Sequence, residues 1–411
     1  MGVRNRSRGP PMLMSKITPA VPPAIPMPVV ATIEQILRAV REHLRMKVAF
    51  VSEFLHGRRH FRHVDADEGT RCIEVGGSDP LEESYCHWVA EGALPGLIRD
   101  PAEHPFTAGL PATAALPVGA HLSVPIRLRD GRVYGTFCCF AFQPDQALTD
   151  RDLATMEAFA QLAAERIQQD VDADERREAK RALVGAVLRD RAIRMTFQPA
   201  FRLDGSGVAF AEALARFRAR LYRTPDQWFA TAAEVGLGRE LEMLAVRTAL
   251  DGCGVLPPEI PVSINASPDT IVHREFADAL GGSALDRLIV EITEHEAVRR
   301  YAELNEALAP LRARGLRVAV DDMGAGHSNF RHVLQIRPEI VKLDIGLVRD
   351  VDADAAKRAL LSALTGFARG IDAELVAEGV ETEGELRALK ALGIGTAQGF
   401  LFGPPVDPWE A

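Results

Sequence analysis

The chain has 411 residues, more than the roughly 100–200 residues of one ordinary domain, so about two or three domains are expected. Hydrophobic residues make up 47% and charged residues 26% of the chain, which is typical of a globular protein and excludes a fibrous or mostly disordered one. The net charge is −9 and the basic residues are scattered, which argues against a groove for polymeric nucleic acid but not against a small anionic ligand.

The first 30 residues are rich in proline and lack the apolar stretch of a signal peptide, so residues 1–30 are expected to form a disordered tail. No apolar run elsewhere reaches the roughly 18–20 residues that cross a bilayer. The five cysteines are odd in number and lack the Cys-x-x-Cys spacing of a zinc or redox site. We therefore expect a cytoplasmic protein with reduced thiols and no membrane contact.

Residues 31–169 contain the signals of a first domain. Residues 32–40 have helical periodicity, and residues 48–55 alternate like a strand. Within residues 121–142, two apolar runs flank Asp130-Gly131, which predicts a hairpin because this dipeptide suits a tight turn. A capping arrangement at residues 149–152 then predicts the start of a long helix.

That helix is expected to continue as a linker over residues 170–192. Charged residues of both signs fill residues 170–181, and an apolar stripe returns at residues 183–188. A solvated spacer and a signalling coiled coil both remain open, because two or three turns of heptad pattern are weak evidence.

Residues 193–411 alternate short apolar runs with helical segments. Eight strands, most of them followed by a helix, predict a TIM-like (β/α)8 barrel, with a doubly wound open sheet as the competing α/β arrangement. The eight expected strands are 195–201, 208–217, 261–267, 288–293, 316–322, 340–345, 374–380 and 396–402.

Seven of these runs carry a polar residue within the strand or at its end. In a parallel barrel the carboxyl ends of the strands meet at one face, so we expect these side chains to converge. Carboxylate and amide oxygens are the ligands of Mg²⁺ or Mn²⁺, and the absence of His and Cys disfavours zinc. One such Glu alone would more often be a solvated or paired residue. The seven sites are Glu212, Asn265, Glu291, Asp321 with Asp322, Lys342, Glu378 and Gln398.

Paired metals about 3.5–4 Å apart would suit an in-line phosphoryl displacement. The adjacent carboxylates of Asp321 and Asp322 allow one to bridge two metals while the other holds the second. Lys342 would offer a charge or a hydrogen bond to the attacking water.

Residues 193–405 resemble the EAL phosphodiesterase domain, whose members hydrolyse cyclic di-GMP. Order and spacing agree over essentially the whole second half of the chain. The matching stretches are Phe197-Gln198-Pro199, Glu212-Ala213-Leu214 followed by Ala215-Arg216-Phe217, Ile264-Asn265-Ala266-Ser267, Glu291-Ile292-Thr293-Glu294, Asp321-Asp322-Met323-Gly324, Val341-Lys342-Leu343-Asp344, Ala377-Glu378-Gly379-Val380 and Gln398-Gly399-Phe400.

The resemblance implies the roles of these residues. The first of two Mg²⁺ or Mn²⁺ ions would be held by Glu212, Asn265, Glu291 and Asp321, and the second by Asp321 and Asp322. The catalytic set would be Lys342 and Glu378, which order the water, and Glu294, which braces the loop after Asp322. Substrate would meet Gln198, Arg216 and Gln398, and the product would be linear pGpG.

The loop after Asp322 departs from the family's usual residues. Met323, His327, Asn329 and Phe330 stand where phenylalanine, tyrosine, serine and leucine are usual. Because the resemblance implies that this loop couples metal binding to dimerisation, we expect the departures to affect regulation and turnover rather than metal ligation.

Residues 31–169 resemble a GAF sensor domain, and the matching stretches are 84–89, 95–100 and 119–126. The resemblance implies an α+β fold with a central antiparallel sheet. The resemblance implies a pocket for a small molecule or cofactor whose identity stays unknown. Cys86 beside His87 suggests a bilin, and His87 or His121 a haem, but a small buried apolar role for Cys86 is favoured.

Together these features predict a GAF-regulated cyclic di-GMP phosphodiesterase that forms a homodimer and is controlled through the helix at residues 170–192. Two alternatives remain open, the first of them from the binding class of proteins. One is a receptor that binds cyclic di-GMP without cleaving it, and the other is an interaction scaffold that uses the linker helix.

Overall fold

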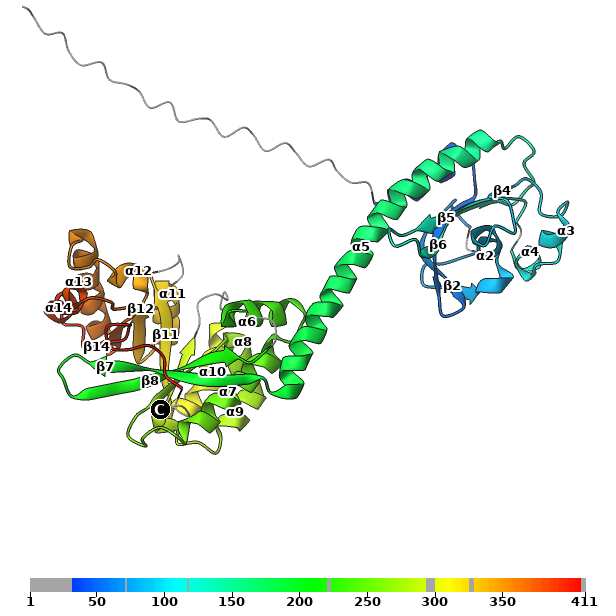
Figure 1. Cartoon of the computed structure of the whole chain (residues 1–411). Helices are drawn as coiled ribbons and strands as arrows, with labels where there is room; N and C mark the ends of the chain where they lie inside the picture. Colours follow the sequence, from blue (N-terminus) through cyan, green and yellow to red (C-terminus); the bar gives the residue numbers. More distant parts are fainter. Residues whose placement is uncertain are drawn as a thin grey trace, which may run out of the picture. The chain divides into compact units, whose positions relative to one another are not determined.

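The computed structural model describes residues 32–70, 72–116, 118–219, 223–292, 300–324 and 329–407 (Figure 1). The chain divides after Asp172 into two compact units. Among the described residues, no helix combines the length and the apolar character needed to span a membrane.

The first unit is built on a six-stranded antiparallel sheet in the order β3-β2-β1-β6-β5-β4. The hairpin expected around Asp130-Gly131 joins β5 to β6, and Gly131 takes a φ of +86° in its turn. The strands are β1 (Val48–Leu55), β2 (Arg58–Ala66), β3 (Ser78–Pro80), β4 (Leu97–Ile98), β5 (Ala120–Arg127) and β6 (Val133–Ala141). The helices are α1 (Ile33–His43), the 3-10 turn η1 (Leu81–Glu83), α2 (Tyr85–Ala90), α3 (Pro105–Ala108) and α4 (Pro111–Ala115).

The two faces of this sheet carry separate cores, because successive side chains of a strand point to opposite sides. On β6, Phe137 and Cys139 pack with α1 and with the first turns of the following helix. The neighbouring Cys138 and Phe140 pack on the other face, together with Cys86 of α2. The central sheet of the predicted α+β fold is therefore present and is covered on both sides.

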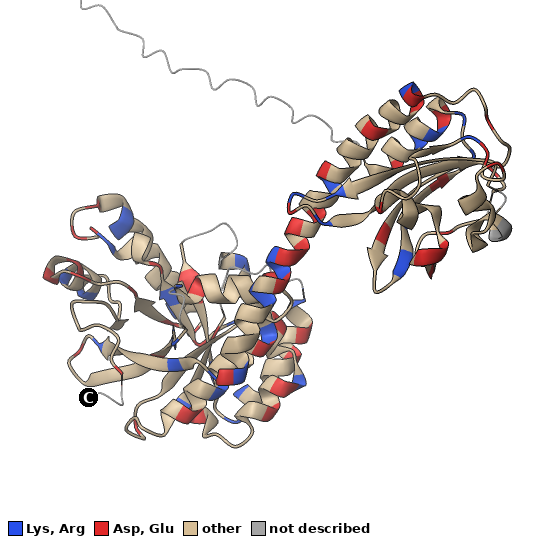
Figure 2. Cartoon of the chain, turned by 45° about the vertical axis from the view of Figure 1, so that its right-hand side comes forward, with Lys and Arg blue, Asp and Glu red and all other residues tan. Residues whose placement is uncertain are grey.

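Helix α5 (Asp150–Asp190) contains the linker helix expected over residues 170–192 except for its last two residues, which lie beyond the end of α5. It begins where the Asp152 carboxylate accepts hydrogen bonds of 2.8 Å from the backbone and the hydroxyl of Thr149. Its early residue Met156 is buried in the core of the first unit, and its late residue Val187 is buried in the core of the second. Residues 173–179 between them are exposed and carry charges of both signs (Figure 2).

The second unit is a closed eight-stranded barrel, which confirms the barrel and excludes the doubly wound open sheet. Strands β8 to β14 run parallel, but β7 runs antiparallel to both of its neighbours, β8 and β14. The strands are β7 (Ile193–Arg202), β8 (Gly207–Phe217), β9 (Val262–Ala266), β10 (Leu288–Ile292), β11 (Arg317–Met323), β12 (Ile340–Leu343), β13 (Glu374–Ala377) and β14 (Thr396–Ala397).

The expectation of a uniformly parallel barrel was wrong at β7. Only residues 203–206 separate β7 from β8, and Gly205 takes a φ of +87° there. A parallel pair needs a crossover of about a dozen residues, so this short connection can only close a hairpin.

Helices surround the barrel strands and bury them on their outer side (Figure 1). They include α7, whose residues Leu241 and Val246 are buried against the barrel. The helices are α6 (Pro225–Glu234), α7 (Gly238–Cys253), α8 (Pro268–Ile271), α9 (Arg274–Leu280), the 3-10 turn η2 (Leu285–Arg287), α10 (Tyr301–Arg312), α11 (Asn329–Ile336), α12 (Ile345–Val348), α13 (Ala355–Gly370) and α14 (Glu383–Ala391).

Candidate active site

Strand alternation sorts the barrel residues into an outer and an inner set. An apolar layer, in which Ile289, Ala319, Ile340 and Val376 pack together, forms a core separate from the one beneath the helices. Two residues further along each of these strands, on the same face, the sequence places a polar side chain. The apolar layer therefore seals the barrel below, and the polar layer forms its mouth. The polar residues above these four positions are Glu291, Asp321, Lys342 and Glu378.

Lys342 lies at the centre of this polar layer and is only 1% exposed. Its Nζ contacts carboxylates from four other strands or strand ends. The distances are 2.6 Å to Glu378 Oε1, 2.8 Å to Glu291 Oε2, 3.3 Å to Asp321 Oδ1 and 3.4 Å to Glu212 Oε2. One ammonium thus holds together four acidic side chains that are distant in sequence.

Two amide side chains extend the network. The Gln398 Nε2 donates to Glu212 Oε2 at 2.6 Å and to Glu378 Oε1 at 3.1 Å. The Asn265 Nδ2 donates to Glu212 Oε1 at 3.4 Å. Six of the predicted residues, with Lys342, therefore form one connected cluster.

Burial and crowding of like charges shift the pKa values of the acids. Burial, with the charges of Glu212 and Asp321, raises the pKa of Glu291 well above its usual range in spite of Lys342. Burial likewise raises the pKa of Glu378 to about 8. Burial also raises the pKa of Glu212, but the Lys342 charge and the Gln398 amide outweigh it and hold that pKa below its usual value. One Lys charge is therefore too small to neutralise the cluster.

Three observations show that the polar residues of the barrel mouth suit divalent cations. The carboxylate oxygens of Asp321, Asp322 and Glu378 lie within 4.8 Å of one another. Glu291 Oε1 and Gln398 Oε1 are buried and have no hydrogen-bond partner among the described atoms. Asp322 holds a φ of +54°, a strained backbone conformation for a residue with a side chain. The oxygens are hard ligands of the kind that Mg²⁺ and Mn²⁺ take.

Two of the predicted substrate residues lie on the first two barrel strands. Gln198 pairs in register with Glu212 across β7 and β8, and its Nε2 is 3.4 Å from the Gly403 carbonyl oxygen. Arg216 follows Glu212 on the same face of β8, about 13 Å further along the strand, beyond the carboxylate layer. Its Nη1 donates to the Ala215 carbonyl oxygen at 2.9 Å.

The loop after Asp322 is only partly described. Glu294 and His327 lie outside the described residues, so their predicted roles stay predictions. Met323 is 2% exposed and packs in the barrel core. Phe330, at the start of α11, is 51% exposed. The centroid of its ring lies 5.6 Å from the centroid of the Phe367 ring.

Two glycines hold site residues in place and were not recognised from the sequence. A Cβ on Gly379, which takes a φ of +65°, would lie 2.4 Å from Ile345 Cγ1. A Cβ on Gly399 would lie 2.2 Å from the backbone nitrogen of Val380. The available signal was that each glycine directly follows a polar site residue, Glu378 or Gln398.

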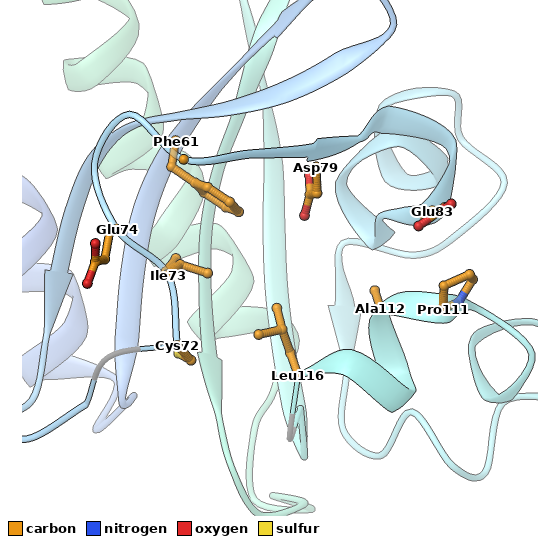
Figure 3. A pocket seen from close by; sticks show the side chains of 10 residues that line it. Phe61, Cys72, Ile73, Glu74, Asp79, Glu83, Pro111, Ala112 and Leu116 are labelled. Carbon is orange, nitrogen blue, oxygen red and sulfur yellow. The ribbon is translucent and has the colours of Figure 1, made fainter.

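The first unit has a cavity of about 310 Å³ beside β2 and β3. In Figure 3 the Phe61 ring, the Asp79 carboxylate and the Leu116 side chain face this space. Cys86 is not among its lining residues and is fully buried, but its surroundings are not only apolar, as was favoured, because Arg59 Nη1 lies 2.9 Å from its Sγ. The cavity is lined by Phe61, Cys72, Ile73, Glu74, Gly77, Asp79, Glu83, Pro111, Ala112 and Leu116.

Comparisons with known proteins assign both units. The sequence profile of the EAL domain matches residues 176–405, and that of the GAF domain matches residues 28–167. The crystal structure of an EAL domain protein from Listeria monocytogenes superposes with a TM-score of 0.51 at 21% identity, covering 56% of this chain and 94% of that one. This likeness supports the barrel fold.

Two curated relatives have names that state an activity. This chain is 27% identical to MucR of Pseudomonas aeruginosa over 234 residues, which are 53% of this chain. That protein is named a bifunctional diguanylate cyclase/cyclic di-GMP phosphodiesterase. Over 233 residues, also 53% of its length, this chain is 29% identical to PdeI of Escherichia coli K12, named a probable cyclic di-GMP phosphodiesterase. The matched part spans 34% and 29% of the lengths of these relatives, about a third. The match of the EAL profile over more than half of the sequence shows that the chain belongs to the EAL domain family.

Proposed function

We propose that this protein hydrolyses cyclic di-GMP to linear pGpG with two divalent cations, Mg²⁺ or Mn²⁺, in the barrel mouth. The observation that carries the proposal is the buried Lys342 within 3.4 Å of four carboxylates, beside two buried oxygens, Glu291 Oε1 and Gln398 Oε1, that have no partner among the described residues. The names of the two relatives agree with this chemistry.

The oxygens of the cluster would hold the cations. Glu212, Asn265, Glu291 and Asp321 would hold one, and Asp321 with Asp322 the other. When bound, the cations supply positive charge that polarises the phosphodiester and lowers the pKa of the attacking water.

The remaining residues would orient water and substrate. Lys342 donates to Glu378 at 2.6 Å and so fixes the direction in which that carboxylate faces the water. Gln398 bridges Glu378 and Glu212, which holds the two carboxylates at a set separation. Arg216 would contact a phosphate of the dinucleotide, and Gln198 would also contact the substrate.

We also propose that the chain forms a homodimer and that the GAF unit controls the barrel through α5. Helix α5 supports this because it contributes buried residues to the cores of both units. The partner of the dimer would be a second copy of this chain, and the ligand of the GAF cavity stays open.

The proposal is tested by incubating the full chain with cyclic di-GMP and Mg²⁺ or Mn²⁺ and by measuring pGpG by chromatography and mass spectrometry. Glu212→Gln should lower the rate by about 100-fold or more, because it removes a metal ligand at the centre of the cluster. The matched control Glu259→Gln changes an exposed residue and should keep the rate within about twofold. Binding of cyclic di-GMP by the unaltered protein with no pGpG formed would contradict the proposal and indicate a receptor.

A further inference from the structure

We propose that Cys86 is a hydroperoxide-reactive thiolate of the GAF unit and that Cys138 is the partner thiol that closes a reversible disulfide with it. The site would take hydrogen peroxide or a small organic hydroperoxide. It lies apart from the barrel mouth and does not depend on cyclic di-GMP hydrolysis.

The two sulfurs come from different elements and meet in the core. Cys86 is on α2 and Cys138 on β6, 52 residues apart in sequence, and their Sγ atoms are 3.1 Å apart. Both residues are fully buried. The adjacent Cys139 faces the opposite side of the sheet, where its Sγ is 3.6 Å from the sulfur of Met156. Only one member of the Cys138-Cys139 pair can therefore reach Cys86.

A buried arginine distinguishes the two sulfurs. The Arg59 Nη1 lies 2.9 Å from Cys86 Sγ, and the Arg59 side chain is only 4% exposed. Its Nε donates to Asp79 Oδ1 at 2.9 Å, so the guanidinium is held in position. The Phe61 ring, 4.9 Å from the guanidinium carbon, supports it from one side. A fixed positive charge at hydrogen-bond distance favours an anionic sulfur.

The hydrogen bonds assign a different role to the second sulfur. The Cys138 thiol is 3.1 Å from Thr136 Oγ1, to which it donates, and 3.1 Å from Ser123 Oγ. Burial and the neighbouring Cys86 raise the pKa of Cys138 well above its usual value. Burial also raises the pKa of Cys86, but Cys138, Arg59 and His121 outweigh it and hold that pKa well below its usual value. Together with the contact of Arg59 Nη1 with Cys86 Sγ, these directions favour the anionic sulfur at Cys86 and the protonated one at Cys138.

His121 completes the cluster. Its ring nitrogen lies within 4.8 Å of both sulfurs, and its Nδ1 is buried with no hydrogen-bond partner among the described atoms. Two cysteines and a histidine are also the donors of a soft metal site. We interpret the cluster as a reactive thiolate and not as a metal site, because Arg59 already places a positive charge at Cys86 and would repel a metal cation.

The chemistry balances with the hydroperoxide as the oxidant. The Cys86 thiolate attacks the outer oxygen of the hydroperoxide, the O–O bond breaks, and the departing alkoxide or hydroxide takes a proton from water. The resulting Cys86 sulfenic acid is attacked by the Cys138 sulfur, and the thiol proton leaves with the hydroxyl group as water. Two electrons leave the sulfur pair and reduce the peroxide bond.

The cavity of the first unit lies beside the Arg59–Cys86 pair. Asp79 and Phe61 line the cavity of about 310 Å³ (Figure 3). Both residues contact Arg59, which in turn contacts Cys86. Two residues that line the cavity therefore also contact the arginine beside Cys86, although Arg59 itself is not among the lining residues. Cys86 itself does not line the cavity, so a small hydroperoxide in it reaches the sulfur only when the side chains between them move.

The test uses the full chain, fully reduced and then exposed to hydrogen peroxide at a few molar equivalents. After alkylation of free thiols, non-reducing peptide mapping should show one cross-link, between the Cys86 and Cys138 peptides, which a dithiol reverses. Cys139→Ser is the matched control, because it changes the neighbouring thiol on the opposite face, and it should form the same cross-link at the same rate. In Cys138→Ser, dimedone should label Cys86.

Charge activation is tested separately by Arg59→Met and Arg59→Lys. The rate of Cys86 oxidation should fall by about tenfold or more in the first and by only a few-fold in the second, because lysine keeps the positive charge. A cross-link between any other pair, or Cys86 oxidation no faster than that of Cys139, would overturn the proposal. So would one equivalent of zinc bound per chain and lost in Cys86→Ser.

Discussion

At the scale of single residues, the barrel mouth depends on an imbalance of charge. Lys342 contributes one positive charge, and the four carboxylates that surround it contribute up to four negative ones. The raised pKa values of Glu291 and Glu378 reflect this imbalance, because burial and neighbouring like charges disfavour the ionised carboxylates. Divalent cations would relieve it in the functional state.

Lys342 is the residue whose removal should affect this balance most. In Lys342→Met the four carboxylates lose their common donor, so we expect hydrolysis to fall by about 100-fold or more. The exposed Lys390→Met is the control and should keep the rate of the unaltered protein. Both rates are measured as pGpG formed per enzyme at saturating Mn²⁺. A Lys342→Met variant that keeps a tenth of the activity or more would contradict the central place of this ammonium.

At the scale of secondary-structure elements, site residues are positioned by where strands end. Glu378 follows β13 and Gln398 follows β14, and each is succeeded by a glycine with a positive φ. Gly399 lets the end of β14 approach the Val380 backbone, whose nitrogen donates to the Gln398 carbonyl oxygen at 3.1 Å. The chain can therefore turn immediately after delivering each side chain.

Gly399→Ala should damage the site through this contact. The added Cβ would lie 2.2 Å from the Val380 nitrogen, and we expect a loss of about 1–3 kcal/mol in unfolding free energy with a matching loss of activity. Gly395→Ala, four residues earlier, is the control because nothing lies within 4 Å of its Cβ position. Thermal unfolding and pGpG formation are compared for the two variants. Equal stability of the two would show that the close approach at Gly399 is not required.

The direction of β7 in the β7–β8 hairpin could not be predicted from the sequence. Both strands were expected at nearly their observed positions, but their direction was not. Because β7 runs antiparallel, Gln198 precedes the interior residue Ala200 instead of following it, and it still shares a face with Glu212. Periodicity indicates that a strand exists and which face is apolar, but it carries no information about strand direction.

At the scale of the whole molecule, α5 is the element that both units share. Its exposed residues 173–179 lie between the turns that belong to the two cores. If the GAF unit controls the barrel through this helix, the helical phase between the two sets of buried residues should matter more than its length.

Insertions after Glu175 test this phase dependence. Two added residues rotate the following turns by about 200°, whereas seven add nearly two full turns and restore the phase to within about 20°. We expect the two-residue insertion to change the hydrolysis rate several-fold and the seven-residue insertion to leave it near that of the unaltered chain. Light scattering of all three proteins should give twice the mass of one chain. Equal rates for both insertions would argue against control through α5.

The properties that could be predicted from the amino-acid sequence are local or chemical in kind. Alternation predicted the strands, the Asp130-Gly131 dipeptide predicted the hairpin, and the residue types at the strand ends predicted an oxygen-rich cluster. Motif order then predicted the EAL and GAF families, which the comparisons confirm. These features could be predicted because they depend on neighbouring residues or on the kinds of residue present.

The contacts between these side chains and the balance of their charges depend on the folded barrel and could not be predicted. The contact of Lys342 with Glu291 joins residues 51 positions apart, and that of Gln398 with Glu212 joins residues 186 apart. Cys86 and Cys138 have no motif spacing at all, yet their sulfurs lie 3.1 Å apart next to Arg59. Such pairs form because the closed barrel and the two-sided sheet bring distant strands together, and no periodicity along the chain encodes that distance.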